Sequence, residues 1–133
     1  MSKVKAFLKQ NKKGNETVDF SLPNFDAPLT IRIISGKEFE AIQERCFINK
    51  PGKKGRQERH FDGTKCNREL CIASLVVPDL NDTELQESYG VMGASDLFGE
   101  MFNWGEQSII LEKVTEASGI DEDINTKIEE AKN

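Results

Sequence analysis

The sequence predicts an α+β fold: a mainly helical single domain with a small N-terminal antiparallel β-hairpin packed on a C-terminal helical bundle. Three observations predict it. The length of 133 residues suits one domain with one compact core. Apolar and polar residues alternate within residues 17–34, as in paired strands with one buried face. From Ser35 to Gly119, helix-capping residues and glycine stops punctuate apolar residues at helical spacing.

The first elements follow from short apolar patterns. Residues 1–16 are expected to form a short helix and a loop, because Val4, Phe7 and Leu8 recur at helical spacing before Gly14. In residues 17–34, the apolar positions 18, 20 and 22 and then 29, 31 and 33 alternate with polar ones. PNFDAP lies between the two runs, so these residues are expected to form the hairpin.

A helical region is expected over residues 35–119. SGKE has the form of a capping box, in which Ser35 accepts from the backbone NH of Glu38 while Glu38 reaches back to Ser35. The helix that follows is expected to end before a basic loop at residues 49–63, and a second helix is expected from about Lys65 to Val77.

Three more helices are expected after Pro78. Asn81 or Asp82 is expected to cap the first, with Gly90 as its stop, and Ser95 the second, with Gly105 as its stop. The third contains residues 109–117 and ends at Gly119. Residues 120–133 are expected to be an acidic tail or a weak helix, so the whole chain, 1–133, is interpreted as one domain.

Charge is divided unevenly between the two halves of the chain. Residues 1–68 contain 15 lysines and arginines and 8 acidic residues, whereas residues 69–133 contain 3 and 15. Halves of opposite sign either attract one another, within a fold or between subunits, or face different partners.

The cysteine pattern and the short apolar runs indicate where in the cell the protein is located. Three cysteines, at 46, 66 and 71, are an odd number without disulfide-framework spacing, and no secretory leader is recognisable. No apolar run approaches the roughly 20 residues that a membrane-spanning helix needs. The sequence therefore predicts a cytoplasmic protein without a membrane-spanning segment.

Metal binding and catalysis have weak sequence support. His60 and the three cysteines lack the paired C-x₂₋₄-C spacing of structural zinc sites, and His60 is the only histidine available as a base for a thiol nucleophile. We predict no catalytic residue, no metal site and no cofactor. Buried thiols and a surface histidine in a loop explain the same residues.

Residues 50–68 carry a basic cluster that keeps a second function open. This segment contains seven cationic and two acidic residues, and basic clusters of this kind contact the phosphate backbones of nucleic acids. The chain as a whole has a net charge of −5 and no nucleic-acid module signature, which favours a solvated loop or one that meets an acidic protein. The cations are Lys50, Lys53, Lys54, Arg56, Arg59, Lys65 and Arg68.

The stretch from residue 89 to 106 is rich in aromatic and methionine side chains. Its apolar positions cover more than one narrow helix stripe, so they serve as core, as a groove for a partner helix, or as both. The candidate partner-binding residues are Tyr89, Met92, Leu97, Phe98, Met101, Phe102 and Trp104.

The run from Pro78 to Glu106 resembles the XkdN-like family of phage tail assembly chaperones. That family has a P-x-L-x-x-x-E-L-Q-x-x-Y-G segment followed by a helix and a GE that opens the next one. The front half, with KAFLKQN and SGKEFEAI, fits as well, although PNFDAPLTIRI stands where the family often has an R-F-K-D type strand. The matching positions are Pro78, Leu80, Glu84, Leu85, Gln86, Tyr89, Gly90, Gly105 and Glu106.

The resemblance implies a small phage or prophage protein that performs no chemistry in the bacterial cytoplasm. Its expected client is the tape measure protein, a long helical chain around which tail tube subunits polymerise, and which the chaperone would keep soluble. Contact with the tail tube protein and self-association stay open. The alternative is a nucleic-acid-binding accessory protein that uses residues 50–68.

Overall fold

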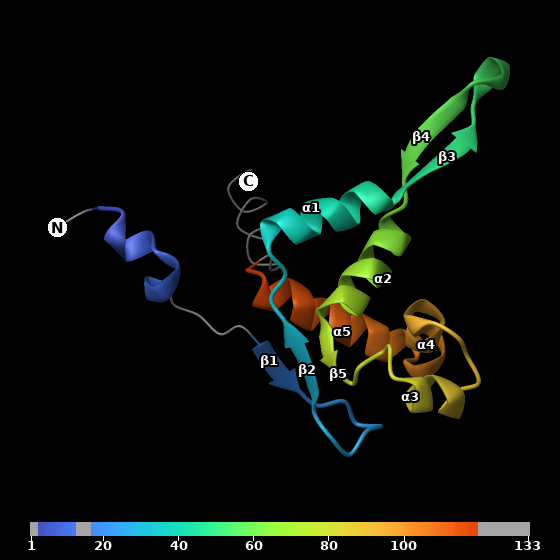
Figure 1. Cartoon of the computed structure of the whole chain (residues 1–133). Helices are drawn as coiled ribbons and strands as arrows, with labels where there is room; N and C mark the ends of the chain where they lie inside the picture. The colour runs from blue at the N-terminus through green and yellow to red at the C-terminus, as the bar shows by residue number, and fades with distance from the viewer. Residues whose placement is uncertain (1–2, 13–16, 120–133) are drawn as a thin grey trace, which may run out of the picture.

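The computed structural model describes residues 3–12 and 17–119, which form helices packed beside a three-stranded sheet, with a separate two-stranded hairpin (Figure 1). The α+β prediction is confirmed. The helices are α1 (Gly36–Arg45), α2 (Gly63–Ser74), α3 (Thr83–Ser88), α4 (Ala94–Met101) and α5 (Trp104–Ala117). The strands are β1 (Thr17–Phe20), β2 (Leu29–Arg32), β3 (Phe47–Pro51), β4 (Gln57–Phe61) and β5 (Leu75–Val77).

The predicted N-terminal hairpin is present as β1 and β2. Val18 lies opposite Ile31 and Phe20 opposite Leu29, and both β2 residues are buried, as the alternating pattern predicted. The sheet has a further strand, β5, which pairs with the other edge of β2. The expectation that the second helix runs to Val77 was therefore wrong.

The helix α2 ends at Ser74 because its last expected turn has a stronger preference for extended backbone. Val76 and Val77 are β-branched, and Val77 precedes a proline, which disfavours the helical conformation. At the other end, α2 starts at Gly63, where the Asp62 carboxylate accepts from the Lys65 backbone NH at 3.0 Å.

The N-terminal segment differs from its prediction. Residues 1–16 were expected to form a short helix and a loop, but the described part contains two 3-10 turns, Lys5–Phe7 and Lys9–Asn11. None of the residues in these turns is buried, and Phe7 is 85% exposed. Because Val4, Phe7 and Leu8 are exposed, the segment lacks the tertiary packing that stabilises most short α-helices.

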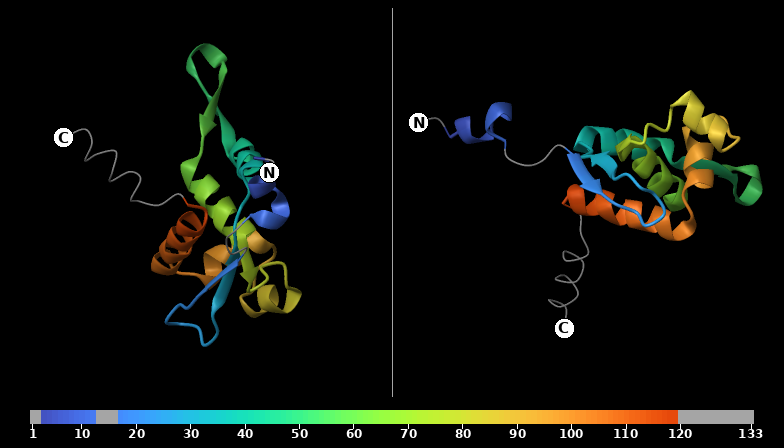
Figure 2. Two further views of the ribbon diagram at one scale, coloured as in Figure 1. Left: turned by 90° about the vertical axis from the view of Figure 1, so that its left-hand side faces the viewer. Right: turned by 90° about the horizontal axis from the view of Figure 1, so that it is seen from below.

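The helix α2 lies at the centre of the molecule. It packs against α1, α4 and α5, while α5 also contacts β2 (Figure 2). One core joins these elements. Its buried apolar residues are Leu22, Leu29, Ile31, Ile34, Ile42, Cys46, Cys66, Leu70, Cys71, Leu75, Leu80, Leu97, Phe98, Phe102, Ile110 and Val114.

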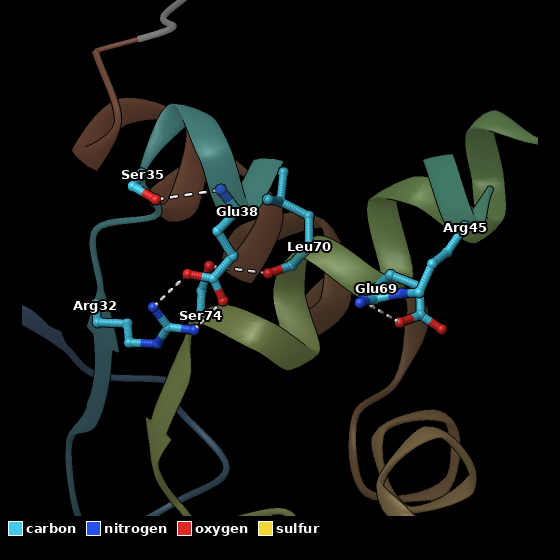
Figure 3. A network of polar contacts seen from close by, with 7 residues as sticks. All are labelled: Arg32, Ser35, Glu38, Arg45, Glu69, Leu70 and Ser74. Carbon is cyan, nitrogen blue, oxygen red and sulfur yellow. Dashed lines mark hydrogen bonds and ion pairs between the residues drawn. The ribbon is translucent and has the colours of Figure 1, made fainter. Parts of the chain in front are cut away.

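Polar contacts hold α1 to its neighbours (Figure 3). Ser35 caps α1, since its hydroxyl accepts from the Glu38 NH at 3.2 Å. The Glu38 carboxylate binds the Arg32 guanidinium of β2 in a bidentate pair, with one contact of 2.8 Å, instead of reaching back to Ser35 as expected. Arg45 pairs with Glu69 of α2 at 3.4 Å.

The basic loop expected at residues 49–63 is instead a β-hairpin, formed by β3 and β4. Five residue pairs join the strands, from Phe47 opposite Phe61 to Pro51 opposite Gln57. The two phenyl rings lie 5.3 Å apart, a cross-strand aromatic pair of the kind that stabilises antiparallel strands. The loop prediction rested on the turn residues Pro51, Gly52 and Gly55, which lie at or next to the hairpin's tip.

The boundary between the last two helices was also misplaced. Ser95 was expected to be the N-cap of α4, but the N-cap residue is Gly93, and the helix ends at Met101. Gly105 was expected to stop a helix, yet it lies in the first turn of α5. The caps predicted at Asp82 and Gly90 are confirmed, whereas residues 120–133 lie outside the described part of the chain.

Candidate partner-binding site

A tight corner between α4 and α5 organises the candidate site. Asn103 caps α5 by accepting from the Glu106 NH at 2.8 Å, and the Glu106 carboxylate accepts from the Asn103 NH at 2.9 Å. Glu106 is 7% exposed, and its second oxygen accepts from the Asn24 amide at 3.3 Å. The Gln107 amide donates to the Phe102 carbonyl at 2.9 Å. These bonds satisfy the buried carboxylate and fix where α5 begins.

Three of the candidate partner-binding residues are core residues. Leu97, Phe98 and Phe102 are 0%, 2% and 1% exposed, so they offer a partner almost no surface. The rings of Phe98 and Phe102 lie 5.5 Å apart, and the Phe102 ring meets Phe25 edge-on at 5.7 Å. The expectation that these side chains contact a partner directly is corrected: all three face the core, and Phe25 of the β1–β2 connection packs against Phe102.

Trp104 is the exposed member of the set. As the first residue of α5 it is 81% exposed, and it borders a groove of about 410 Å³ between α2, α4 and α5. The apolar side chains lining the groove are those of Cys71, Phe98, Phe102, Trp104 and Leu111. Its polar lining residues are Thr64, Asn67, Arg68, Asn103, Gln107 and Ser108.

The groove's α2 residues were not predicted as part of the site. Thr64, Asn67 and Arg68 lie far from residues 89–106 in sequence, and packing of α2 against α4 and α5 brings them there. Neither spacing nor composition indicates this juxtaposition.

The remaining candidates lie at or near the surface. Met92 is 88% exposed and Tyr89 37% exposed, while Met101 is half-buried against the core. The connection that carries Met92 is held by one side chain, Gln86, which donates to the Leu80 carbonyl at 2.9 Å and accepts from the Gly93 NH at 3.0 Å.

Cysteine and histidine do not assemble into a reactive site in the part of the chain that the structure describes. Cys46 and Cys71 are buried, and desolvation raises their pKa values to about 11 and about 12, which keeps both thiols protonated near neutral pH. His60 is exposed on β4, with Nε2 3.1 Å from a Glu58 carboxylate oxygen. Within residues 3–12 and 17–119, no three histidine, cysteine or acidic side chains are grouped as metal ligands.

The seven cations of residues 50–68 are divided between two elements. Lys65 and Arg68 belong to α2, whereas Arg59 of the hairpin lies over the Phe47 ring and pairs with Glu44 of α1. The cations left at the hairpin's tip are Lys50, Lys53, Lys54 and Arg56, all exposed.

Comparison with known families identifies the chain. Residues 4–132 match the model of the phage XkdN-like tail assembly chaperones, which covers almost the whole sequence. The chain belongs to this family. The residues by which it resembles the XkdN-like chaperones have structural roles: Leu80 is buried, Gln86 holds the α3–α4 connection, and Glu106 completes the cap of α5.

Other comparisons bear on the fold. A crystal structure of the protein yqbn has a TM-score of 0.67 at 16% identity, over 91% of this chain and 99% of that one. At this identity the likeness shows a shared fold. No curated protein matches the sequence. Among the described residues, no helix of this XkdN-like chaperone is both long enough and apolar enough to cross a membrane.

Proposed function

We propose that this tail assembly chaperone binds helical segments of the tape measure protein, without enzymatic chemistry, in the bacterial cytoplasm. It would keep that client soluble until the tail tube forms. The observation that carries the proposal is Trp104, whose indole is 81% exposed beside a groove with an apolar floor. Long amphipathic helices waiting for assembly expose apolar stripes that aggregate unless a partner covers them.

The groove has the composition that recognises such a stripe. Trp104 and the half-buried Leu111 offer the apolar surface that would meet side chains spaced three and four residues apart on a client helix, and the polar lining residues suit the flanks of that helix. Met92, with its flexible thioether, adds an adaptable contact that tolerates many similar helices. Tyr89 and Met101 are the secondary candidates.

The exposed cations of the β3–β4 hairpin support a second candidate, nucleic-acid binding. Lys53, Lys54 and Arg56 crowd a tip that projects beyond the helices (Figure 1). Salt separates the two candidates, since phosphate contacts weaken steeply as salt rises and apolar contacts do not.

The test is co-expression with overlapping fragments of the tape measure protein from the same phage or prophage. The chain is expected to raise the soluble fraction of helical fragments and to co-purify with them at both about 0.1 M and about 0.5 M salt. Expression of each fragment alone is the control. Fragments that stay insoluble with the chain present, or complexes lost at the higher salt, would contradict groove binding.

A further inference from the structure

The β3–β4 hairpin is firmly mounted at its base. The Arg59 guanidinium lies 3.9 Å above the centroid of the Phe47 ring and also pairs with the Glu44 carboxylate of α1. Phe61 packs against Phe47, and the Asp62 NH donates to the Cys46 carbonyl at 2.8 Å. These contacts fix the direction in which the hairpin leaves the helices.

The tip of the hairpin carries more cations than carboxylates: the acidic residue there is Glu58, which lies opposite Lys50 and pairs with His60. A tight turn closes it, in which Lys54 and Gly55 adopt positive φ angles of 61° and 73°, and the Gly52 NH donates to the Arg56 carbonyl at 2.6 Å. No ion pair to another described residue neutralises the tip. We call its four exposed cations the basic tip: Lys50, Lys53, Lys54 and Arg56.

A surface of opposite sign lies around α3. Four exposed carboxylates occur there within nine residues, and they too form no ion pair within the described part of the chain. Two of them also order the backbone: Asp79 accepts from the Asn81 NH and Asp82 from the Leu85 NH. The members of this acidic α3 surface are Asp79, Asp82, Glu84 and Glu87.

The two surfaces lie at opposite ends of the molecule. The hairpin points to the top of Figure 1 and of the left view of Figure 2, whereas α3 lies at the bottom of both. The central helices separate them, so the basic tip does not meet the acidic α3 surface of its own chain.

We propose that the basic tip of one copy docks on the acidic α3 surface of a second copy. The two surfaces carry four charges each, of opposite sign, and such complementarity steers association and sets its register. Because the surfaces differ, the contact is heterologous, and copies join head to tail. This inference is independent of the proposed client, since neither surface includes Trp104 or the lining of its groove.

Sedimentation of the full chain tests the docking. The weight-average mass of the wild type is expected to rise with protein concentration at about 20 mM salt and to fall to that of one chain at about 500 mM, where screening is short-ranged. Two reversal variants, K53E/R56E and E84K/E87K, are each expected to weaken self-association about tenfold or more. An equimolar mixture of the two is expected to associate again, because each variant supplies the surface that the other has lost.

Matched controls separate docking from net charge. K5E/K9E and E100K/E112K change exposed residues outside both surfaces by the same charge, and they are expected to associate like the wild type. Thermal unfolding by circular dichroism checks that every variant folds. A wild type that stays monomeric at low salt overturns the proposal, as does a mixture that fails to associate. A monomeric wild type that binds a DNA duplex, with the binding lost in K53E/R56E, would overturn the proposal in favour of nucleic-acid binding.

Discussion

Replacing Trp104 with alanine is expected to weaken binding of a helical tape measure fragment far more than it weakens folding. A tryptophan side chain offers up to about 250 Å², and 81% of this residue is exposed, which leaves about 200 Å² for a client to cover. At about 25 cal/mol per Å², covering that area is worth about 5 kcal/mol before the costs of ordering and imperfect contact. We therefore expect a loss of about 2 to 4 kcal/mol, or about 30- to 1000-fold in Kd.

Isothermal titration with a soluble client peptide measures this loss, and thermal unfolding measures the effect on folding. Phe7→Ala is the matched control, because Phe7 is 85% exposed and lies on the N-terminal turns, away from the groove. Trp104→Ala is expected to unfold within a few degrees of the wild type, since an exposed side chain contributes little to stability. Equal affinities of Trp104→Ala and the wild type would refute the reasoning from exposed area.

Three further predictions concern the folded chain itself. Phe98→Ala is expected to lower the free energy of unfolding by about 3 to 5 kcal/mol in urea titrations, because it leaves a cavity in a core position that is 2% exposed. The Arg32 guanidinium holds the pKa of the Glu38 carboxyl below its ordinary 4.5, so that pair stabilises the fold above that pH and the contribution disappears as pH falls through the lowered value. Glu38→Gln is expected to flatten this acid-side loss of stability, measured as the urea midpoint against pH. Cys46 and Cys71, with pKa values of about 11 and 12, are expected to react with a chromogenic disulfide at pH 8 only after denaturant is added, whereas rapid labelling of the native chain would contradict their burial.

The sequence predicted those elements that are stabilised by contacts between residues close together in the chain. The Ser35 and Asp82 caps and the hairpin alternation of residues 17–34 depend on neighbours a few residues away, and each was predicted. Strand β5 was missed because its partner, β2, lies more than forty residues earlier in the sequence. Pairing at that separation leaves no periodic signal in three residues.

The location of the partner-binding site stays a prediction, whereas the burial of its candidate residues can be compared with the sequence pattern. Composition pointed to residues 89–104, where Trp104 and Met92 are indeed exposed. Composition does not indicate which aromatic faces inward, since Phe98 and Phe102 are as apolar as Trp104. Phe102 packs against Phe98 and against Phe25, which a distant connection contributes. The α2 side of the groove depends likewise on packing between separate helices.

The cap that joins Asn103 to Glu106 has a consequence for how Trp104 meets a client. The indole belongs to the residue immediately after the cap, so folding has already ordered its backbone. Only the two side-chain torsions remain to be restricted on binding, at a cost on the order of 1 kcal/mol. In the proposed complex, a preorganised anchor of this kind would keep most of its contact energy as affinity, and it would hold one helical segment firmly while the rest of a long client stays unbound.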